Sequence, residues 1–250
     1  MALALASPAR AAAITGRPLS LVALGDSISC GQGVGVHVAP DSTWPVLLAA
    51  ALGAAPVVLA TPGARVRDVL TEQLRPALAV QPDIVTLLVG LNDVLWAGSC
   101  AVGPELVEVL APLRATTVLV VRLHDPTELL PLPAAARAGV LRRVGQVNAA
   151  VDAAATAAGA RVIDLAALPA LRRRDAWAVD RLHPNPHGHA LIAAAAGTAL
   201  GLPGAPAGPA PGAPPARSAE LAWVARHGLP YLAGHGRRLA PGALAALARR

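Results

Sequence analysis

Leu19-Ser-Leu-Val-Ala-Leu-Gly-Asp-Ser27 is the stretch that decides the fold, because a nearly unbroken apolar run ends there in a glycine, an aspartate and a serine. Such runs are typical of strands in a parallel sheet that is covered on both faces. The Gly-Asp-Ser end predicts a turn into a helix, with Asp26 or Ser27 capping the helix N-terminus. The strand would thus deliver a serine hydroxyl to the carboxyl end of a sheet.

Short apolar runs recur along the chain and alternate with stretches of helical pattern. The other expected strands are Pro56–Ala60, Asp83–Gly90, Thr116–Leu123 and Ala160–Leu165. The expected helices are Trp44–Leu52, Val66–Val80, Pro104–Leu113, Ala134–Ala158 and Pro186–Leu200. Alternating strands and helices indicate right-handed β-α-β crossovers. We therefore expect an α/β fold, a three-layer α/β/α sandwich with a central five-stranded parallel sheet.

Composition divides the chain into four parts. We expect residues 1–18 to form an N-terminal extension and residues 19–201, which hold all the expected strands, to form the main domain. Residues 202–216 contain six prolines and predict a linker or an extended surface strap. Residues 217–250 predict a short helical tail, with helices over Ser218–His227 and Pro241–Arg250, which could cover the site or pack on the opposite side of the domain.

The charge of the chain is positive, since 21 basic residues, all arginine, face 15 acidic ones. A basic balance can attract nucleic acid or anionic lipid. Proteins that bind single-stranded nucleic acid interleave basic residues with aromatic stacking platforms, and only 2% of this chain is aromatic. We therefore expect no nucleic-acid partner and interpret the arginines as solvated surface.

The N-terminus and the apolar stretches indicate where in the cell the protein is expected. Residues 1–10 lack a basic segment ahead of their apolar stretch, so a secretory signal is not expected. The longest apolar stretch, Trp44 to Ala60, is broken by Gly53 and Pro56 and is therefore no transmembrane candidate. These features predict a cytoplasmic protein without stable membrane insertion.

A second motif, Asp180-Arg-Leu-His183, follows the last expected strand and complements the serine. An unaided serine hydroxyl is a weak nucleophile and needs a base within about 3 Å. His183 is the candidate base, and Asp180 would orient its imidazole and stabilise the imidazolium. Serine, histidine and aspartate are the groups that acyl-transfer chemistry requires, although each motif alone also fits a capped turn.

Donors for a developing oxyanion are expected after two further strands. Gly63 follows the second strand and would let a backbone N–H approach a ligand closely. Asn92 follows the third strand and offers a side-chain NH₂ group. Both also fit ordinary turn and capping roles. Together with the Ser27 N–H they would supply three donors at one edge of the sheet.

In combination, these four motifs resemble the SGNH (GDSL-type) hydrolases. The matching blocks are Gly25-Asp-Ser-Ile28, Gly63, Gly90-Leu-Asn-Asp93 and Asp180-Arg-Leu-His-Pro184. The resemblance implies a flavodoxin-like fold and hydrolysis of a small-molecule acyl ester without a metal or organic cofactor. It implies Ser27 as nucleophile, Asp180 and His183 as its triad partners, and Ser27, Gly63 and Asn92 as the oxyanion hole.

The chain departs from the family pattern at two places. Ile28 stands where the name-giving motif has leucine, and residues 57–62 lack the asparagine that often precedes the second-block glycine. An ordinary α/β-hydrolase is disfavoured, because Gly25-Asp-Ser-Ile-Ser29 lacks the second glycine of the Gly-x-Ser-x-Gly elbow.

Several alternatives accompany this interpretation. The same triad could serve an acyltransferase, or the fold could be a non-catalytic ligand-binding module. His183, His187 and His189 with Asp180 could hold a metal, but the prolines between them favour a rigid loop that aims His183, and we expect no metal site. His124-Asp125 fits a pocket wall or a local turn. Sequence alone does not show that Cys30 and Cys100 lie close enough to pair.

Overall fold

Five parallel strands form the central sheet of the computed structural model, in the order β4-β1-β5-β6-β7. The structure describes residues 18–96, 101–114, 116–202 and 208–235. The strands are β1 (Leu19–Gly25), β4 (Ala54–Val58), β5 (Ile84–Leu88), β6 (Thr117–Arg122) and β7 (Arg161–Asp164). The expected five-stranded parallel sheet is therefore confirmed.

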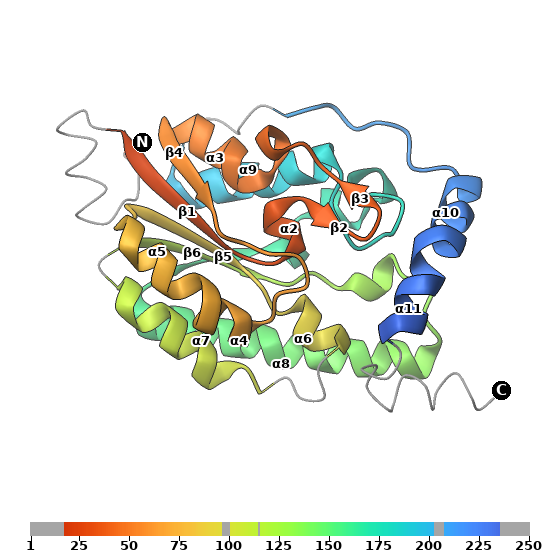
Figure 1. Cartoon of the computed structure of the whole chain (residues 1–250), viewed down its shortest axis with the longest axis horizontal. Helices are drawn as coiled ribbons and strands as arrows, with labels where there is room; N and C mark the ends of the chain where they lie inside the picture. Colours follow the sequence, from red (N-terminus) through yellow and green to blue (C-terminus); the bar gives the residue numbers. More distant parts are fainter. Residues whose placement is uncertain (1–17, 97–100, 115, 203–207, 236–250) are drawn as a thin grey trace.

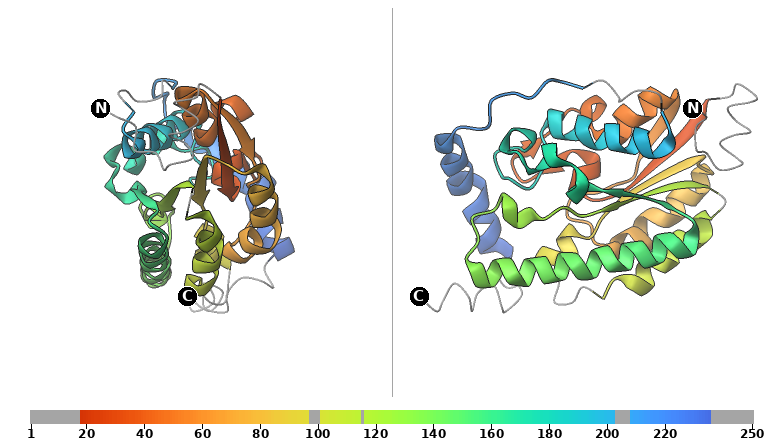
Figure 2. Two further views of the ribbon diagram at one scale, coloured as in Figure 1. Left: turned by 90° about the vertical axis from the view of Figure 1, so that its left-hand side faces the viewer. Right: turned by 180° about the vertical axis from the view of Figure 1, so that it is seen from behind.

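Helices cover both faces of the sheet (Figures 1 and 2). On one face lie α3 (Trp44–Leu52) and α9 (Pro186–Leu200), and on the other lie α5 (Leu74–Val80), α7 (Gly103–Leu110) and α8 (Ala134–Ala158). All five residues of β5 are buried, as a central strand covered on both faces requires. The expected three-layer α/β/α sandwich is confirmed. Among the described residues, no helix combines the length and apolar character needed to cross a bilayer.

Strand order places a topological switch point at the carboxyl end of β1. The chain leaves β1, forms β4 on one side of it, and then crosses to form β5 on the other side. Ligands of open α/β sheets bind at such a switch point, outside the carboxyl ends of the strands. Ser27 follows β1 and Asn92 follows β5, so both lie at this point.

The remaining elements are short, and most lie at the carboxyl edge or in the C-terminal tail. They are α2 (Ser27–Cys30), β2 (Gln32–Gly33), β3 (Val36–His37), α4 (Val66–Asp68), α6 (Leu91–Trp96), α10 (Arg217–Trp223) and α11 (Leu229–His235). Strands β2 and β3 pair as an antiparallel hairpin that is separate from the main sheet. Single turns of 3₁₀ helix connect several of the larger elements.

The second strand begins and ends earlier than the sequence pattern predicts. Ala54 and Ala55 pair with the start of β1, although alanine is a weak strand former, because the neighbouring strand supplies the ladder. At the other end, the N–H groups of Leu59 and Ala60 both donate to the carbonyl of Ala23, at 2.9 and 3.1 Å. Two donors on one carbonyl end the regular ladder, so β4 spans Ala54–Val58 and not Pro56–Ala60.

The helix expected over Val66–Val80 contains a wide turn. Residues Val69–Gln73 (η2) form a π-helical turn, in which the N–H of Leu74 donates to the carbonyl of Val69. Pro76 follows this turn; it has no N–H for the carbonyl of Glu72, and its ring crowds that carbonyl. A single π-helical turn relieves this conflict without ending the helix.

The C-terminal tail departs from the prediction in its extent. Helical structure runs from Arg217 to His235, through a second π-helical turn at Val224–Gly228 (η8), whereas the pattern predicted an end at His227. Pro230 follows this turn as Pro76 follows the first. The other expected tail helix, Pro241–Arg250, lies outside the described residues.

The Pro/Gly/Ala-rich stretch is a strap where the structure describes it. Residues 208–216 have no helix or strand and run from the α9 side to α10 (Figure 1). Gly208 lies so close to Ala190 of α9 that a Cβ atom at position 208 would overlap the alanine side chain. Nδ1 of His187 lies 3.0 Å from the carbonyl oxygen of Pro209. The strap is therefore attached to the last helix of the sandwich.

Gly25 ends β1 in a conformation that only glycine adopts readily, with φ at +130°. A Cβ atom at this position would overlap the carbonyl oxygen of Leu88 at the end of β5. Gly53, which ends α3, also has positive φ, at +64°, but a Cβ atom there would meet nothing within 4 Å. A side chain at position 25 would thus meet both backbone strain and steric overlap, whereas one at position 53 would meet backbone strain alone.

We expect Gly25→Ala to lower the free energy of unfolding by more than about 3 kcal/mol, because strain and overlap add. Gly53→Ala, the matched control, should cost about 1 kcal/mol from left-handed backbone strain alone. Urea unfolding followed by circular dichroism measures both. Equal losses in the two variants would show that the contact with Leu88 imposes no constraint.

Candidate active site

Ser27 is the first residue of α2, directly beyond the carboxyl end of β1. The Asp26 N–H donates to the carbonyl of Leu88 at 3.2 Å, and Asp26 Oδ1 accepts from the Ile28 N–H at 3.0 Å as the helix N-cap. Gly31 closes the short helix in the left-handed conformation. Ser27 is therefore held between two fixed turns and is only 9% exposed.

His183 lies against Ser27 and carries Asp180 on its other ring nitrogen. Nε2 of His183 is 2.8 Å from Oγ of Ser27, and Nδ1 is 2.5 Å from Oδ2 of Asp180. The second carboxylate oxygen, Oδ1, accepts the backbone N–H groups of Leu182 and His183, each at 3.0 Å. Asp180 thus fixes both the ring and the backbone that carries it.

The loop between these residues is strained at one position. Arg181, between Asp180 and His183, has φ at +62°, which a non-glycine residue adopts at a cost of about 1–2 kcal/mol. Strained residues persist where the surrounding structure holds them, and they gather at functional sites. The loop is closed by bonds between the Ala178 N–H and the His183 carbonyl, at 2.8 Å, and between the Arg181 N–H and the Ala178 carbonyl, at 3.2 Å.

The hydrogen bonds assign the proton positions. An ionised Asp180 only accepts, so Nδ1 of His183 carries the ring proton and Nε2 is free to accept the Ser27 hydroxyl. Burial lowers the pKa of His183, but the hydrogen bond and charge of Asp180, with the charge of Asp26, outweigh burial and leave this pKa above its ordinary value of 6.5. Burial raises the pKa of Asp180, but the His183 ring and two backbone N–H groups bring it below the usual range. The arrangement favours an ion pair once the imidazole gains a proton.

Asp26 is a second buried carboxyl group beside Ser27. Burial raises its pKa to about 7, against the smaller effects of the Ile28 N–H and the His183 charge. Its Oδ2 atom has no hydrogen-bond partner among the described residues. Asp26 therefore combines helix capping with a charge that varies near neutral pH.

Asn92 contacts the segment that carries Gly63, because it binds Ala64, the next residue along the chain. Gly63 is exposed and has φ at +78°, so its turn requires the freedom of glycine. Nδ2 of Asn92 donates to the carbonyl of Ala64 at 3.0 Å. Oδ2 of Asp93 accepts the N–H of Val66 at 3.2 Å. The segment after β5 thus holds the segment after β4 by two bonds.

Comparison with known proteins places this chain in a family. The model of the GDSL-like lipase/acylhydrolase family matches residues 23–191, which include all four motif blocks. The chain belongs to this family. The expectation of a GDSL-type hydrolase is confirmed. A comparison with curated protein sequences gave no match.

Solved structures share the fold of this hydrolase. An α/β-hydrolase enzyme from the metagenome of Lake Arreo, Spain, is 23% identical, with a TM-score of 0.58 over 74% of this chain and 95% of its own. A catalytic mutant of Axe2, an acetylxylan esterase from Geobacillus stearothermophilus, is 19% identical, with a TM-score of 0.57 over 73% and 94%. The psychrotrophic esterase EstA from Pseudoalteromonas sp., inhibited by monoethylphosphonate, is 17% identical, with a TM-score of 0.55 over 73% and 96%.

Gln73 is a residue of the hydrolase site that the sequence pattern did not reveal. Its side-chain amide accepts the Gly25 N–H and donates to the Gly25 carbonyl, both at 2.9 Å, and donates to the Thr61 hydroxyl at 3.2 Å. Gln73 is buried in the π-helical turn, and such turns are frequent at functional sites. It joins the end of β1 to the segment that leads to Gly63. The local sequence carried no signal of this role, because the partners Gly25 and Thr61 are 48 and 12 residues away.

Gly33 is a second such residue. It lies in the β2–β3 hairpin, and a Cβ atom there would lie 2.6 Å from Cε1 and Nδ1 of the His183 ring. The imidazole is held by Ser27 and Asp180 and has little freedom to move aside. Only glycine leaves room for the ring at this place.

The other polar residues singled out in the sequence take structural positions. Nδ1 of the buried His189 accepts the Trp44 N–H at 3.1 Å, and burial lowers the pKa of His189 to about 3. Asp125 caps a turn through the N–H and hydroxyl of Thr127, at 2.7 and 2.6 Å. His124 is buried against Trp177, with ring centroids 4.5 Å apart.

The histidines considered as metal ligands therefore point to different partners in the described structure. His183 faces Ser27, His187 faces the strap and His189 faces α3. Of the two cysteines, Cys30 has its Sγ 3.8 Å from the Ser27 carbonyl, and Cys100 lies outside the described residues.

We expect Gly33→Ala to displace the His183 ring and to lower the free energy of unfolding by about 1–3 kcal/mol, as overpacking does. Separation from Asp180 removes the interaction that raises the His183 pKa, so this pKa should fall. Imidazole NMR titration measures it. The control is Gly139→Ala on α8, where a Cβ atom meets nothing within 4 Å. This control variant should leave the His183 titration unchanged. An unshifted His183 titration in Gly33→Ala would contradict the close contact.

Proposed function

We propose that this hydrolase cleaves carboxylic esters of small or medium acyl groups through an acyl-enzyme on Ser27. The observation that carries the proposal is the chain Ser27 Oγ–His183 Nε2–Asp180, with distances of 2.8 and 2.5 Å. A serine activated by a positioned imidazole whose other nitrogen is held by a carboxylate is suited to acyl transfer. Family membership supports the same reaction class.

The first step joins Ser27 to the acyl group. As Oγ attacks the carbonyl carbon, its proton passes to Nε2 of His183, and the carbonyl oxygen takes the negative charge. Asp180 stabilises the imidazolium through the Nδ1 hydrogen bond and its buried charge. Collapse of the tetrahedral species breaks the bond to the alcohol oxygen, which takes the proton from Nε2.

The second step releases the acid. Water enters where the alcohol left, gives a proton to Nε2 and attacks the acyl carbon; collapse then returns the proton to Ser27 Oγ. Residues of this chain supply the nucleophile, the base and the base's partner, so the scheme requires no additional group.

The oxyanion hole of the proposal consists of the Ser27 N–H, the Gly63 N–H and the Asn92 NH₂ group. Two features support it. Asn92 uses one amide proton on Ala64, so its second proton can face a ligand. Gly63 lies in an exposed turn close to Thr61. The Gln73 side chain binds both Thr61 and Gly25, and so connects this turn to the segment that carries Ser27. Removal of one such donor typically costs about 3 kcal/mol of transition-state stabilisation.

Short acyl esters are the first substrates to test. The acetylxylan esterase and the esterase inhibited by monoethylphosphonate share the fold, and their names suggest acetyl esters and phosphonate reagents as probes. Ser27 itself is 9% exposed, which suits an acyl group small enough to enter a confined site.

We expect Ser27→Ala to reduce kcat/KM for p-nitrophenyl acetate by at least about 1000-fold, since no other hydroxyl replaces the nucleophile. A fluorophosphonate probe should label the wild-type enzyme at Ser27 and fail to label the variant. The control is Ser42→Ala, at a half-buried serine whose hydroxyl bonds its neighbour Asp41. A folded Ser27→Ala enzyme that hydrolyses the ester at the wild-type rate would refute the proposal.

The pH profile provides an independent test. Because neutral His183 is the base, kcat/KM should rise with pH through an apparent pKa above 6.5, in the direction that Asp180 and Asp26 shift this group. Asp26→Asn preserves the helix cap and removes a nearby negative charge, so the rise should move to lower pH. Initial rates from about pH 5 to pH 9 measure both. A flat wild-type profile would count against His183 as base.

A further inference from the structure

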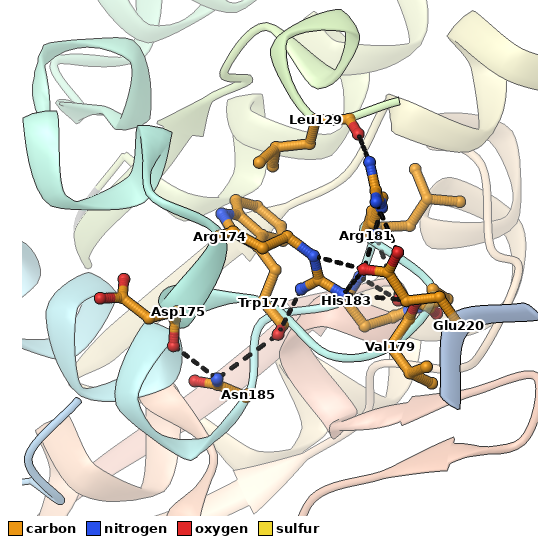
Figure 3. A network of polar contacts seen from close by, with 11 residues as sticks. Leu129, Arg174, Asp175, Trp177, Val179, Arg181, His183, Asn185 and Glu220 are labelled. Atoms are coloured by element: carbon orange, nitrogen blue, oxygen red, sulfur yellow. Dashed lines mark hydrogen bonds and ion pairs between the residues drawn. The ribbon is translucent and has the colours of Figure 1, made fainter. Parts of the chain in front are cut away.

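The C-terminal helix α10 lies beside the loop that carries Asp180 and His183 (Figures 1 and 3). Its Glu220 accepts hydrogen bonds from two arginines of that region. Arg174 donates to Oε1 through Nε and Nη2, at 2.9 and 2.7 Å, and Arg181 donates to Oε2 through Nη2, at 2.5 Å. The Glu220 side chain is only 13% exposed. One carboxylate from the tail is thus shared by two guanidinium groups.

Each arginine also binds the backbone near the site. Arg174 donates to the carbonyl of Trp177 at 2.8 Å and more weakly to that of Val179 at 3.4 Å. Arg181 donates to the carbonyl of Leu129, in the segment after β6, at 3.0 Å. Glu220 therefore binds one arginine that holds the backbone just before the Asp180–His183 loop and one that belongs to this loop (Figure 3).

The strained position in the loop is the one that Glu220 holds. Arg181 separates Asp180 from His183 and has φ at +62°. Its side chain makes bonds to Glu220 and Leu129 that favour this conformation over a relaxed one. A shift of the Arg181 backbone would move both the base of Ser27 and the carboxylate that holds this base.

The same tail also contacts the β2–β3 hairpin, which packs on the imidazole. Nε1 of Trp223 donates to the carbonyl of Val34 at 2.8 Å. The His227 ring lies 2.7 Å from where a Cβ atom of residue 35 would be. Gly33 of the same hairpin packs on the His183 ring. The tail therefore touches both the loop that carries this ring and the hairpin that packs on it.

We propose that Glu220 is a positioning residue, which holds the Asp180–His183 loop so that Nε2 of His183 stays within hydrogen-bond distance of Ser27. The inference rests on the proposed function, because it assigns Glu220 to the support of the same base. It adds a part that the family match does not include, since that match ends at residue 191. The C-terminal tail accordingly works as part of the active site.

The chemistry of the contact suits this role. Arginine presents several N–H groups in a planar fork, so two arginines can saturate one carboxylate in a fixed geometry. Hydrogen bonds from Arg181 and then from Arg174, against the opposing effect of burial, hold the pKa of Glu220 below its usual range. Glu220 therefore stays charged at every pH at which His183 is neutral and can act as a base. A neutral amide of the same shape is the informative replacement.

The first test is Glu220→Gln. We expect kcat for p-nitrophenyl acetate to fall about 10- to 100-fold, as displacement of a catalytic group does, with little change in KM. Rates are divided by the concentration of sites that the fluorophosphonate probe labels, so that unfolded protein does not lower the measured kcat. The matched control is Glu105→Gln, which breaks the pair between the exposed Arg67 and the half-buried Glu105, 3.5 Å apart, and should leave kcat unchanged.

A second variant separates backbone strain from the side-chain contact. Arg181→Gly relieves the positive φ and removes the bonds to Glu220 and Leu129. If the side-chain contact positions the loop, Arg181→Gly should lose kcat like Glu220→Gln, and the double variant should lose less than the sum of the two losses in activation free energy. Wild-type kcat in Arg181→Gly would overturn the proposal.

A third measurement does not depend on turnover. In Ser27→Ala protein, we expect the Nδ1 proton of His183, in its short bond to Asp180, to give a strongly downfield NMR signal, which Glu220→Gln should weaken or abolish. The role of Glu220 would be refuted if Glu220→Gln left this signal unchanged and also left kcat unchanged in the enzyme that retains Ser27. Failure of the proposed function would be recognised separately, by esterase activity that survives Ser27→Ala.

Discussion

The close approach of Gly25 to the carbonyl of Leu88 is the constraint on which the site depends. At this point β1 and β5 end side by side, and the backbone leaves β1 with no room for a side chain. The Asp26 N–H binds the same carbonyl, so the segment carrying Ser27 starts from a fixed position relative to β5 and the residues beyond it. Gln73 binds the other side of Gly25 and joins it to the segment after β4. Three chain segments are thereby tied to one residue.

Much of this arrangement could be predicted from local sequence. Strands with unbroken apolar runs, such as β5, and the glycine-to-serine turn after β1 follow from periodicity and turn chemistry. The motifs also predicted that Ser27, Asp180 and His183 gather at one edge, where the structure brings them within hydrogen-bond distance. Gln73, Gly33 and Glu220 could not be identified in this way. Each acts through a contact with residues far away in sequence, and nothing in its own neighbourhood distinguishes it from a core or surface residue.

The two buried carboxyl groups near Ser27 have opposite electrostatic behaviour, although both are aspartates in loops. Asp180 accepts three hydrogen bonds and remains a carboxylate, whereas Asp26 accepts one and has a pKa of about 7. Such divergence between neighbouring titratable groups is typical of sites that carry out acid–base chemistry. Burial is the largest effect on both groups; at Asp180 the His183 ring and two backbone N–H groups together outweigh it, whereas at Asp26 it prevails.

The π-helical turn at Val69–Gln73 has a consequence for how the site tolerates change. One extra residue in a turn rotates the preceding part of the helix by about 100° relative to the part after the turn, given 3.6 residues per turn. The rotation sets the helical phase that presents Gln73 to the sheet. Pro76 is exposed, and it favours the turn because it has no N–H for the carbonyl of Glu72. Replacing it with a good helix former would make the helix locally more regular and would turn the glutamine away from Gly25.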